Sequence, residues 1–307
     1  MRQASIDLGT NTCLLLVRDS GGSVLHDEST VVRLGEGVAA SGILKPEAMN
    51  RARECIEKYV RIATGFGVSA QDIVAVGTAQ ARDAKNAAPF FADLKASLGV
   101  DFRILSGDEE ARATFLGAAL PGIDASRMVV MDIGGGSTEL VAIPEGANAL
   151  LGTSLGIGAV KITEKFLFSN PVSDAEFWAA EEAIDRELSA LLSWRDELGL
   201  RIKGEPEFVA VAGTAVTLAM LQLGSSTYDQ KQLDGVELKR GDVHRIVEEL
   251  KWRSIEERKA MVGMESKRAD VILAGALIFW RVMEKLRFPL VRISTRGLRY
   301  GVLGQAS

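Results

Sequence analysis

The sequence predicts a mixed α/β protein that is built from two related halves. Three observations support this prediction: the chain length, a pair of repeated motifs, and the order of the expected strands and helices. The 307 residues correspond to two domains at roughly 150 residues each. Apolar residues make up 47% of the chain and charged residues 25%, so each half can form a core.

The repeated motifs are the more specific observation. Residues 4–17 read ASIDLGTNTCLLLV, and residues 129–142 read VVMDIGGGSTELVA. In both segments an apolar run reaches an Asp, and a Gly with small polar residues precedes a second apolar run. A second pair follows in the same order, VAVGTA at 74–79 and VAVAGTA at 209–215. Two unlike motifs that recur in one order predict a duplicated architecture.

The first half is expected to alternate strands and helices. Residues 47–65 are an expected helix, because Pro46 stands directly before them and proline is favoured at a helix start. The other expected elements of this half are short strands at 73–77 and 102–106 and a helix at 107–119. The stretch 121–126 is the expected junction. We therefore predict domains at residues 1–121 and 122–307, with the last helix a candidate to pack back on the first domain.

The second half is expected to begin with a hairpin, at 129–133 and 139–143, around a run of glycines. Residues 173–193 are an expected long helix, which opens with the capping-box residues Ser173 and Glu176. The remaining expected elements are strands at 209–212 and 291–294, a helix from residue 214, and an apolar helix at 268–286. Hairpins followed by β-to-α units predict two mixed sheets with helices outside.

Charge and cysteine content exclude several classes of protein. The 36 Lys and Arg residues against 41 Asp and Glu residues give a net charge of −5, which argues against general binding to nucleic acid. Two cysteines cannot form a disulfide scaffold. Two cysteines and two histidines also make a zinc site with Cys and His ligands difficult to build. The longest apolar stretch, 271–280, is about half a membrane span. With Asp7 where a signal peptide needs its apolar run, we expect a cytoplasmic protein that is not bound to membranes.

The two glycine-rich turns are the main candidates for phosphate binding. A tight turn of this kind can direct backbone N–H groups at an anion, and glycine allows phosphate oxygens to approach closely. For either turn alone a simple hairpin is the more common explanation, but their pairing across two halves favours phosphate binding. The turn residues are Gly9, Thr10, Asn11 and Thr12 in the first half, and Gly134, Gly135, Gly136, Ser137 and Thr138 in the second.

Carboxylates beside these turns predict a cation. Asp7 and Asp132 stand at matching strand ends, and Glu139 follows the second turn. A carboxylate next to a phosphate is favourable when a hard cation lies between them, so these three residues suggest Mg²⁺. Neither turn is a Walker A loop, because no Gly-Lys-Ser/Thr follows it.

The segment LSGDEEAR at 105–112 suggests a general base. Ser106 and Glu109 have capping-box spacing, so Glu109 is expected to cap the helix. Glu110 has no such structural role and is the better candidate to activate a water molecule. The alternative is that Glu110 is one more acidic residue in a first helical turn. Arg33 and Arg82 stand next to glycine-rich turns, and arginine suits bidentate phosphate contacts, although most surface arginines are only solvated.

These motifs resemble those of a known family. Residues 6–12, IDLGTNT, resemble the first phosphate motif of the exopolyphosphatase and guanosine pentaphosphate phosphatase family, and residues 132–139, DIGGGSTE, resemble the second. Four further segments are similar to the family and stand in the same order: GTA with Arg82 and Asn86, SG with EEAR at 106–112, RAD with AG at 268–275, and GLR at 297–299. The matches run from Ile6 to Gly301.

The resemblance implies the actin, Hsp70 and sugar-kinase superfold, in which two ribonuclease-H-like domains enclose a cleft. It implies that Glu110 is the catalytic base, that Asp132 and Glu139 are associated with Mg²⁺, and that Arg33 and Arg82 line the cleft. The departures are Thr12-Cys13, where many members have Ser and then Val or Ile, and Tyr300, where many have Glu. Longer relatives continue into a further helical region after the part that corresponds to this sequence, so we expect a weaker groove for long polymers and less processive action on them.

The expected function is therefore that of a Mg²⁺-dependent phosphoanhydride hydrolase. Its substrates would be inorganic polyphosphate, pppGpp (giving ppGpp, the alarmone of the stringent response), or both. The alternatives are an ATP-dependent kinase of the same superfold and a sensor that binds an alarmone or nucleotide without turnover. Neither nucleic acid nor a membrane is expected as a partner, and a homodimer is left open.

Overall fold

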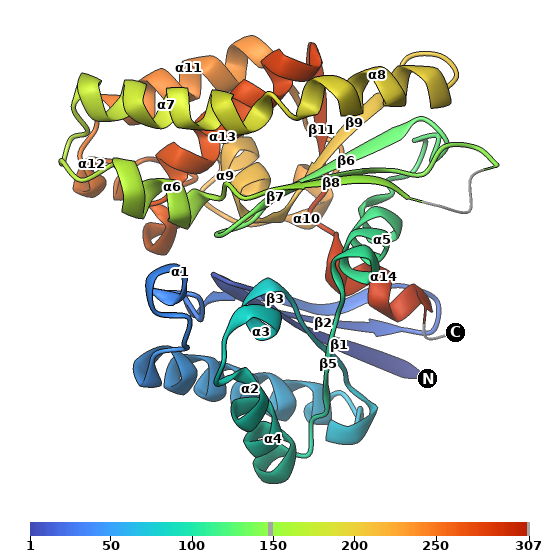
Figure 1. Ribbon diagram of the computed structural model, residues 1–307. Helices are drawn as coiled ribbons and strands as arrows, with labels where there is room; N and C mark the ends of the chain where they lie inside the picture. The colour runs from blue at the N-terminus through green and yellow to red at the C-terminus, as the bar shows by residue number, and fades with distance from the viewer. Residues whose placement is uncertain (147–149, 306–307) are drawn as a thin grey trace. The chain divides into compact units, whose positions relative to one another are not determined.

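The computed structural model describes residues 1–146 and 150–305 and divides the chain into two compact units (Figure 1). Unit 1 comprises Met1–Gly117 together with Gly297–Ser307, and unit 2 comprises Ala118–Arg296. The boundary inferred from the sequence, between residues 121 and 122, lies slightly further along the chain. The C-terminal helix is counted with unit 1, so that unit is discontinuous in sequence.

The sheet of unit 1 has five strands in the order β3-β2-β1-β4-β5. Strand β2 pairs antiparallel with both β1 and β3, whereas β4 pairs parallel with β1, and β5 pairs parallel with β4. Successive side chains of a strand point to opposite faces, and β1 and β4 are buried at consecutive positions, so both faces of the sheet are covered. The strands are β1 (Arg2–Leu8), β2 (Thr12–Asp19), β3 (Val24–Val31), β4 (Val74–Gly77) and β5 (Phe102–Ile104).

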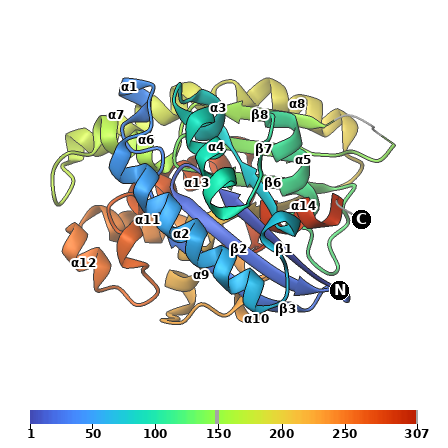
Figure 2. The same cartoon turned by 90° about the horizontal axis from the view of Figure 1, so that it is seen from below.

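Helices cover both faces of this sheet. On β4, Ala75 belongs to the core formed with α2 and α4, whereas the next residue, Val76, packs with Ala113 of α5 and Val302 of α14. Adjacent strand residues face opposite sides, so these two helix pairs lie on opposite faces (Figures 1 and 2). The helices are α1 (Val38–Ser41), α2 (Pro46–Gly65), the 3₁₀ turn η1 (Ala70–Asp72), α3 (Ala79–Asp83), α4 (Ala87–Leu98), α5 (Gly107–Ala118) and α14 (Leu298–Gln305).

The sheet of unit 2 repeats this arrangement. Its order is β10-β11-β9-β6-β7-β8, in which β6, β7 and β8 are antiparallel and β9 runs parallel to β6. Strands β6 to β9 therefore correspond to β1 to β4, as the repeated motifs predict. The strands are β6 (Met128–Ile133), β7 (Thr138–Ala142), β8 (Leu151–Leu155), β9 (Glu207–Val211), β10 (Glu237–Lys239) and β11 (Leu290–Ile293).

Helix α13 is the centre of the core of unit 2. Its side chains are almost all buried, and it packs against α6, α7, α9 and α11 (Figure 1). The sequence predicted this apolar helix. The helices of the unit are α6 (Ala159–Phe166), α7 (Asp174–Leu188), α8 (Leu191–Arg201), α9 (Ala212–Leu223), α10 (Gln230–Leu233), α11 (Arg240–Lys251), α12 (Ile255–Lys259), the 3₁₀ turn η2 (Ser266–Arg268) and α13 (Ile272–Leu286).

Two expected helices differ from the structure. The predicted helix at 173–193 is wrong in its length, because α7 ends at Leu188 and a new helix starts at Leu191. Ser189 lies at the break, where its hydroxyl donates to the carbonyl of Arg186 at 2.6 Å and competes with the helical backbone. The predicted helix at 268–286 starts at Ile272, because residues 266–268 form a 3₁₀ turn. Within the described ranges, no helix has the length and apolar character needed to cross a membrane.

Candidate active site

The two glycine-rich turns have the same backbone structure. In the turn between β1 and β2 (loop 1, residues 9–12), the N–H of Gly9 donates to the carbonyl of Thr12 at 2.9 Å. In the turn between β6 and β7 (loop 2, residues 134–138), the N–H of Gly134 donates to the carbonyl of Ser137 at 3.0 Å. The N–H groups of Gly9 and Gly134 therefore close the turns and are not the donors that face a ligand.

A following segment supports each loop from one side. After β3, the N–H groups of residues 32 and 33 donate to the carbonyl of Asn11, and that of Gly35 donates to the carbonyl of Thr10. After β8, the N–H of Ala159 donates to Gly134, and those of residues 160 and 161 donate to Gly135. Beside these donors lie two similar sequences, LGEG at 34–37 and LGIG at 155–158, a third repeat that the sequence analysis missed.

Glycine is required in both supporting segments because they approach the loops so closely. A Cβ atom at Gly35 would lie 2.4 Å from Cγ2 of Thr10. A Cβ atom at Gly158 would lie 2.5 Å from the carbonyl carbon of Gly135. Such distances are far below van der Waals contact, so the close fit between each loop and its support depends on these glycines.

This support orients one peptide of each loop. The carbonyls of Thr10 and Gly135 point to their supporting segments, and the C=O and N–H of a trans peptide point in opposite directions. The N–H groups of Asn11 and Gly136 therefore point away from the support. Each unit thus presents a backbone donor at the same position of its loop, which is the arrangement that binds anions.

Glu109 and Glu110 of α5 have different partners, and Glu109 caps the helix as expected. The carboxylate of Glu109 accepts a bond from the N–H of Ser106 at 2.8 Å, and the N–H of Glu109 donates to the Ser106 hydroxyl at 3.3 Å. This reciprocal pair is the predicted capping box. Glu110 takes no part in it. Its carboxylate instead contacts Nη1 of Arg82 at 2.7 Å, and that same nitrogen donates to the carbonyl of Leu105 at 2.7 Å.

Electrostatics link Glu110 to the end of β1. Burial raises the pKa of Glu110 above its usual value, while Arg82 opposes the rise and Asp83 adds to it. Burial also raises the pKa of Asp7 to about 7, the charge of Glu110 adds to the rise, and Arg299 opposes it. Because the charge of Glu110 raises the pKa of Asp7, unit 1 brings Asp7 and the Arg82–Glu110 pair together beside loop 1. Carboxylates with raised pKa values are typical of active sites.

In unit 2, Asp132 and Glu139 are opposite each other in the register of β6 and β7. Directly opposed residues project from the same face of a sheet, and both side chains are half-buried. The hydroxyl of Ser154 donates to Glu139 at 3.0 Å. Mg²⁺ usually takes one or two protein carboxylates and completes its shell with water and phosphate oxygens, so this oxygen pair fits the ion. Across residues 1–146 and 150–305, no three His, Cys, Asp or Glu side chains gather in a group that could hold a metal.

Two predicted phosphate-binding residues have further structural features. Arg33 has a backbone φ of 51°, a conformation that is uncommon outside glycine, and its N–H holds loop 1 through Asn11. The hydroxyl of Thr138 is fully buried and donates to the carbonyl of Ile157 at 2.7 Å. This hydroxyl therefore holds loop 2 to its supporting segment.

The comparisons with known proteins agree with these observations. Residues 16–306 match the model of the Ppx/GppA phosphatase family. The chain belongs to the Ppx/GppA phosphatase family. It is 32% identical to exopolyphosphatase 2 of Mycobacterium tuberculosis, over 93% of this chain and 91% of that one. The solved structure of an exopolyphosphatase from Cytophaga hutchinsonii has a TM-score of 0.85 at 27% identity and covers 100% of this chain and 97% of its own. The chain therefore has the actin-like two-domain fold of this family of hydrolases.

A second group of relatives of this family is longer. The guanosine-5'-triphosphate,3'-diphosphate pyrophosphatase of Vibrio vulnificus is 34% identical over 72% of this chain, but the match spans only 43% of that protein. This chain therefore matches less than half of the length of that pyrophosphatase.

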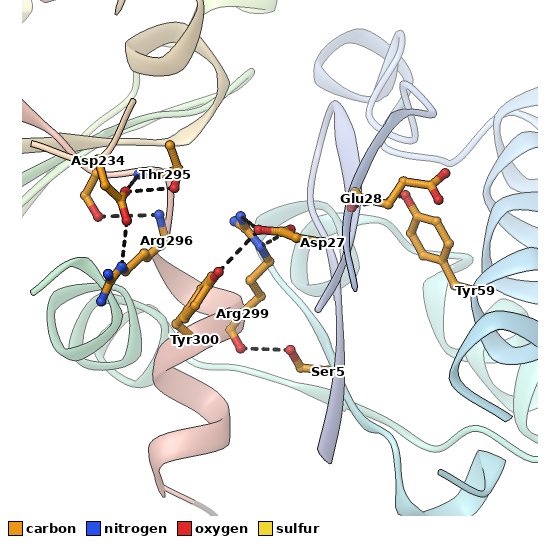
Figure 3. Close-up of polar contacts among 10 residues, drawn as sticks. Ser5, Asp27, Glu28, Tyr59, Asp234, Thr295, Arg296, Arg299 and Tyr300 are labelled. Atoms are coloured by element: carbon orange, nitrogen blue, oxygen red, sulfur yellow. Dashed lines mark hydrogen bonds and ion pairs between the residues drawn. The ribbon is translucent and has the colours of Figure 1, made fainter. Parts of the chain in front are cut away.

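The structure explains one departure from the Ppx/GppA motifs, in unit 1 at the start of α14 (Figure 3). Arg299 donates from Nε and Nη2 to the two carboxylate oxygens of Asp27, at 3.0 and 2.8 Å. Tyr300 donates to the same carboxylate at 3.3 Å, and Ser5 donates to the carbonyl of Arg299 at 2.8 Å. Tyr300, where many members have Glu, thus adds a donor to a buried carboxylate. Sequence reasoning missed Asp27 because nothing local marks a contact across more than 270 residues.

Proposed function

We propose that this chain hydrolyses the terminal phosphoanhydride bond of inorganic polyphosphate, and that pppGpp, converted to ppGpp, is the second substrate to test. The placement of Glu110 carries the proposal. Glu109 caps helix α5, which leaves Glu110 in contact with Arg82 and within electrostatic reach of Asp7. Polyphosphate comes first because the relative that matches over nine-tenths of both chains is named an exopolyphosphatase.

Glu110 would orient the attacking water and accept its proton. Its raised pKa makes it a stronger base than an exposed glutamate, and Arg82 keeps its carboxylate in one position. Arg82 would also neutralise charge on a bound phosphate, because an arginine can share its donors between two anions. The N–H of Asn11 in unit 1 and that of Gly136 in unit 2 would each donate to a phosphate oxygen.

Asp132 and Glu139 would hold Mg²⁺, and Asp7 is the matching carboxylate of unit 1. When bound, the ion would supply positive charge to phosphate oxygens. The carboxylates themselves place two hard oxygen ligands beside loop 2. Arg33 would add a cation beside loop 1, where its backbone already holds Asn11.

The test is phosphate release by the purified protein from long polyphosphate, tripolyphosphate, pppGpp and ATP, measured in parallel with Mg²⁺ and with excess EDTA. We expect Mg²⁺-dependent release from at least one of the first three, with one ¹⁸O atom from labelled water in each phosphate released. The ranking of substrates then separates a polyphosphatase from an alarmone phosphatase.

Other outcomes would contradict the proposal. Transfer of phosphate to an added acceptor, without ¹⁸O incorporation, would identify a kinase of the same fold. Tight binding of pppGpp without turnover would identify a sensor. Release that EDTA leaves unchanged would refute the assignment of Asp132 and Glu139 to a metal.

A further inference from the structure

The two cysteines of the chain lie in one buried cluster of unit 1. Cys13 is the first buried residue of β2, and Cys55 lies on α2. Their side chains are 0% and 6% exposed, and both belong to the same core. Nothing in the proposed hydrolysis uses either thiol.

Tyr59 fixes the relative placement of these elements. It lies one helical turn after Cys55 on α2, and its hydroxyl donates to the carbonyl of Cys13 at 3.2 Å and to the hydroxyl of Thr30 at 2.8 Å. Thr30 is the register partner of Cys13 on β3. The same phenol also reaches the carbonyl of Glu28, at 3.4 Å (Figure 3). This side of α2 is therefore held against the start of β2, and residues one turn apart lie on the same side.

The two thiols are close enough that each shifts the pKa of the other. Cys13 has the largest effect on Cys55 and lowers its pKa despite its burial, whereas burial raises the pKa of Cys13 well above its usual value. The hydroxyls of Thr30 and Tyr59 also lower the pKa of Cys55. Cys55 is therefore the more easily ionised thiol of the two. Oxidation of the more acidic of two neighbouring thiols allows the second to form a disulfide with it.

We propose that Cys13 and Cys55 are an oxidisable pair, which a hydroperoxide converts into an intramolecular disulfide. The sulfur of Cys55 attacks one oxygen of the peroxide, so that an S–O bond forms, the O–O bond breaks, and hydroxide leaves. The sulfur of Cys13 then attacks the sulfenic acid at Cys55. The S–S bond forms, the S–O bond breaks, and the proton of Cys13 leaves with that oxygen as water. Two electrons pass from the thiols to the peroxide.

The disulfide would affect loop 1. Cys13 directly follows Thr12, so the bridge ties the end of the loop to α2. We expect phosphate release to slow when the bridge forms and to recover when it is reduced. This consequence rests on the proposed function, whereas formation of the bridge does not.

The test is treatment of the folded protein with hydrogen peroxide, followed by catalase, denaturation and thiol titration. The chain has two cysteines, so a complete reaction lowers the thiol count from two to none. We expect a monomer whose mass is lower by two hydrogen atoms and which regains both thiols with a phosphine reductant. Two remaining thiols, oxygen added without loss of hydrogen, or a bridge between two chains would overturn the proposal.

Two variants test the order of the steps. In Cys13→Ser, peroxide should leave a sulfenic acid at Cys55, which dimedone captures. In Cys55→Ser, Cys13 should remain unmodified. A dimedone adduct on Cys13 and none on Cys55 would overturn the assigned roles. Because thiol titration and mass need no substrate, they decide the disulfide even if the protein releases no phosphate. Unchanged phosphate release by the fully bridged protein would overturn the coupling to loop 1.

Discussion

Two adjacent glutamates of α5 show how local structure can give the same residue type different roles. Glu109 and Glu110 are the same residue type in the same helical turn, but only Glu109 bonds back to Ser106. Glu110 projects from a different side of the helix and meets Arg82. The capping box was predictable from spacing alone. The partner of Glu110 was not, because Arg82 lies 28 residues away on another helix.

The first prediction concerns pH. A general base works when it is ionised, so kcat/KM should fall as the pH drops through the pKa of Glu110. Because burial raises that pKa above its ordinary 4.5, the fall should begin above the range of an exposed glutamate. Arg82 opposes the rise, so Arg82→Gln should move the acid limb to still higher pH. The measurement is the pH profile of kcat/KM for both proteins. A limb that stays in place, or moves to lower pH, would contradict the pairing.

At the scale of elements, the duplicated loops depend on the segments packed beneath them. The second prediction is that Gly158→Ala raises KM, on the order of tenfold, because the new Cβ would lie 2.5 Å from Gly135 and displace loop 2. The backbone of Gly158 has φ −148° and is open to alanine, so the effect is steric. The matched control is Gly199→Ala on α8, where nothing lies within 4 Å of the new atom. The control should keep its KM and gain up to about 1 kcal/mol of stability. Equal kinetics for the two variants would refute the steric argument.

The third prediction concerns Arg51 of α2. Its Nε donates to the carbonyl of Val32 at 2.9 Å, and its Nη2 contacts the carboxylate of Glu36 at 3.0 Å, so it holds both sides of Arg33. We expect Arg51→Gln to raise KM because Arg33 loses its backbone support. Arg61→Gln on the same helix, which breaks an exposed pair with Glu57, should change nothing measurable.

A double-mutant cycle separates positioning by Arg51 from general destabilisation. If Arg51 acts through Arg33, its replacement should add little to the KM of Arg33→Gln. Additive effects of the two changes would show that Arg51 acts elsewhere. If Arg33→Gln alone leaves the kinetics unchanged, the role assigned to Arg33 is wrong instead.

The periodicity of apolar residues and the positions of proline and glycine predicted the longer helices and strands well. Pro46 marks the start of α2, and the hairpin of β6 and β7 surrounds its glycines as expected. The division between α7 and α8 was missed because neither Gly nor Pro marks it, and the bond from the Ser189 hydroxyl to a backbone carbonyl has no signal in the sequence. The supporting segments of the loops were missed as well. Their role depends on distances between backbones, which a sequence does not contain.

At the scale of the whole molecule, unit 1 is completed by a helix from the far end of the chain. Gly301 of α14 packs so closely on α5 that a Cβ there would lie 1.8 Å from the carbonyl oxygen of Ala113. The buried pair of Arg299 and Asp27 ties the same helix to β3, with side chains only 7% and 10% exposed. The sequence marked this segment as a family motif and left open which domain it joins.

The fourth prediction follows from that pair. Arg299→Ala leaves the carboxylate of Asp27 buried without its guanidinium, so it should lower the free energy of unfolding by about 3–5 kcal/mol. Arg186→Ala, which removes an exposed pair on α7, is the control and should have little effect. Urea unfolding measures both. A loss in Arg299→Ala no larger than in the control would contradict a structural role for α14 in unit 1.

The central claim is that Glu110 activates water for hydrolysis of a phosphoanhydride. The most direct test compares single-turnover phosphate release by Glu110→Gln and Glu109→Gln, on the best substrate and with Mg²⁺. We predict that Glu110→Gln slows release by about 10²–10⁴-fold with little change in unfolding free energy. Glu109→Gln should keep near-normal release and lose about 1 kcal/mol of stability through its weakened cap. Full turnover by Glu110→Gln, or loss of turnover only in Glu109→Gln, would contradict the account.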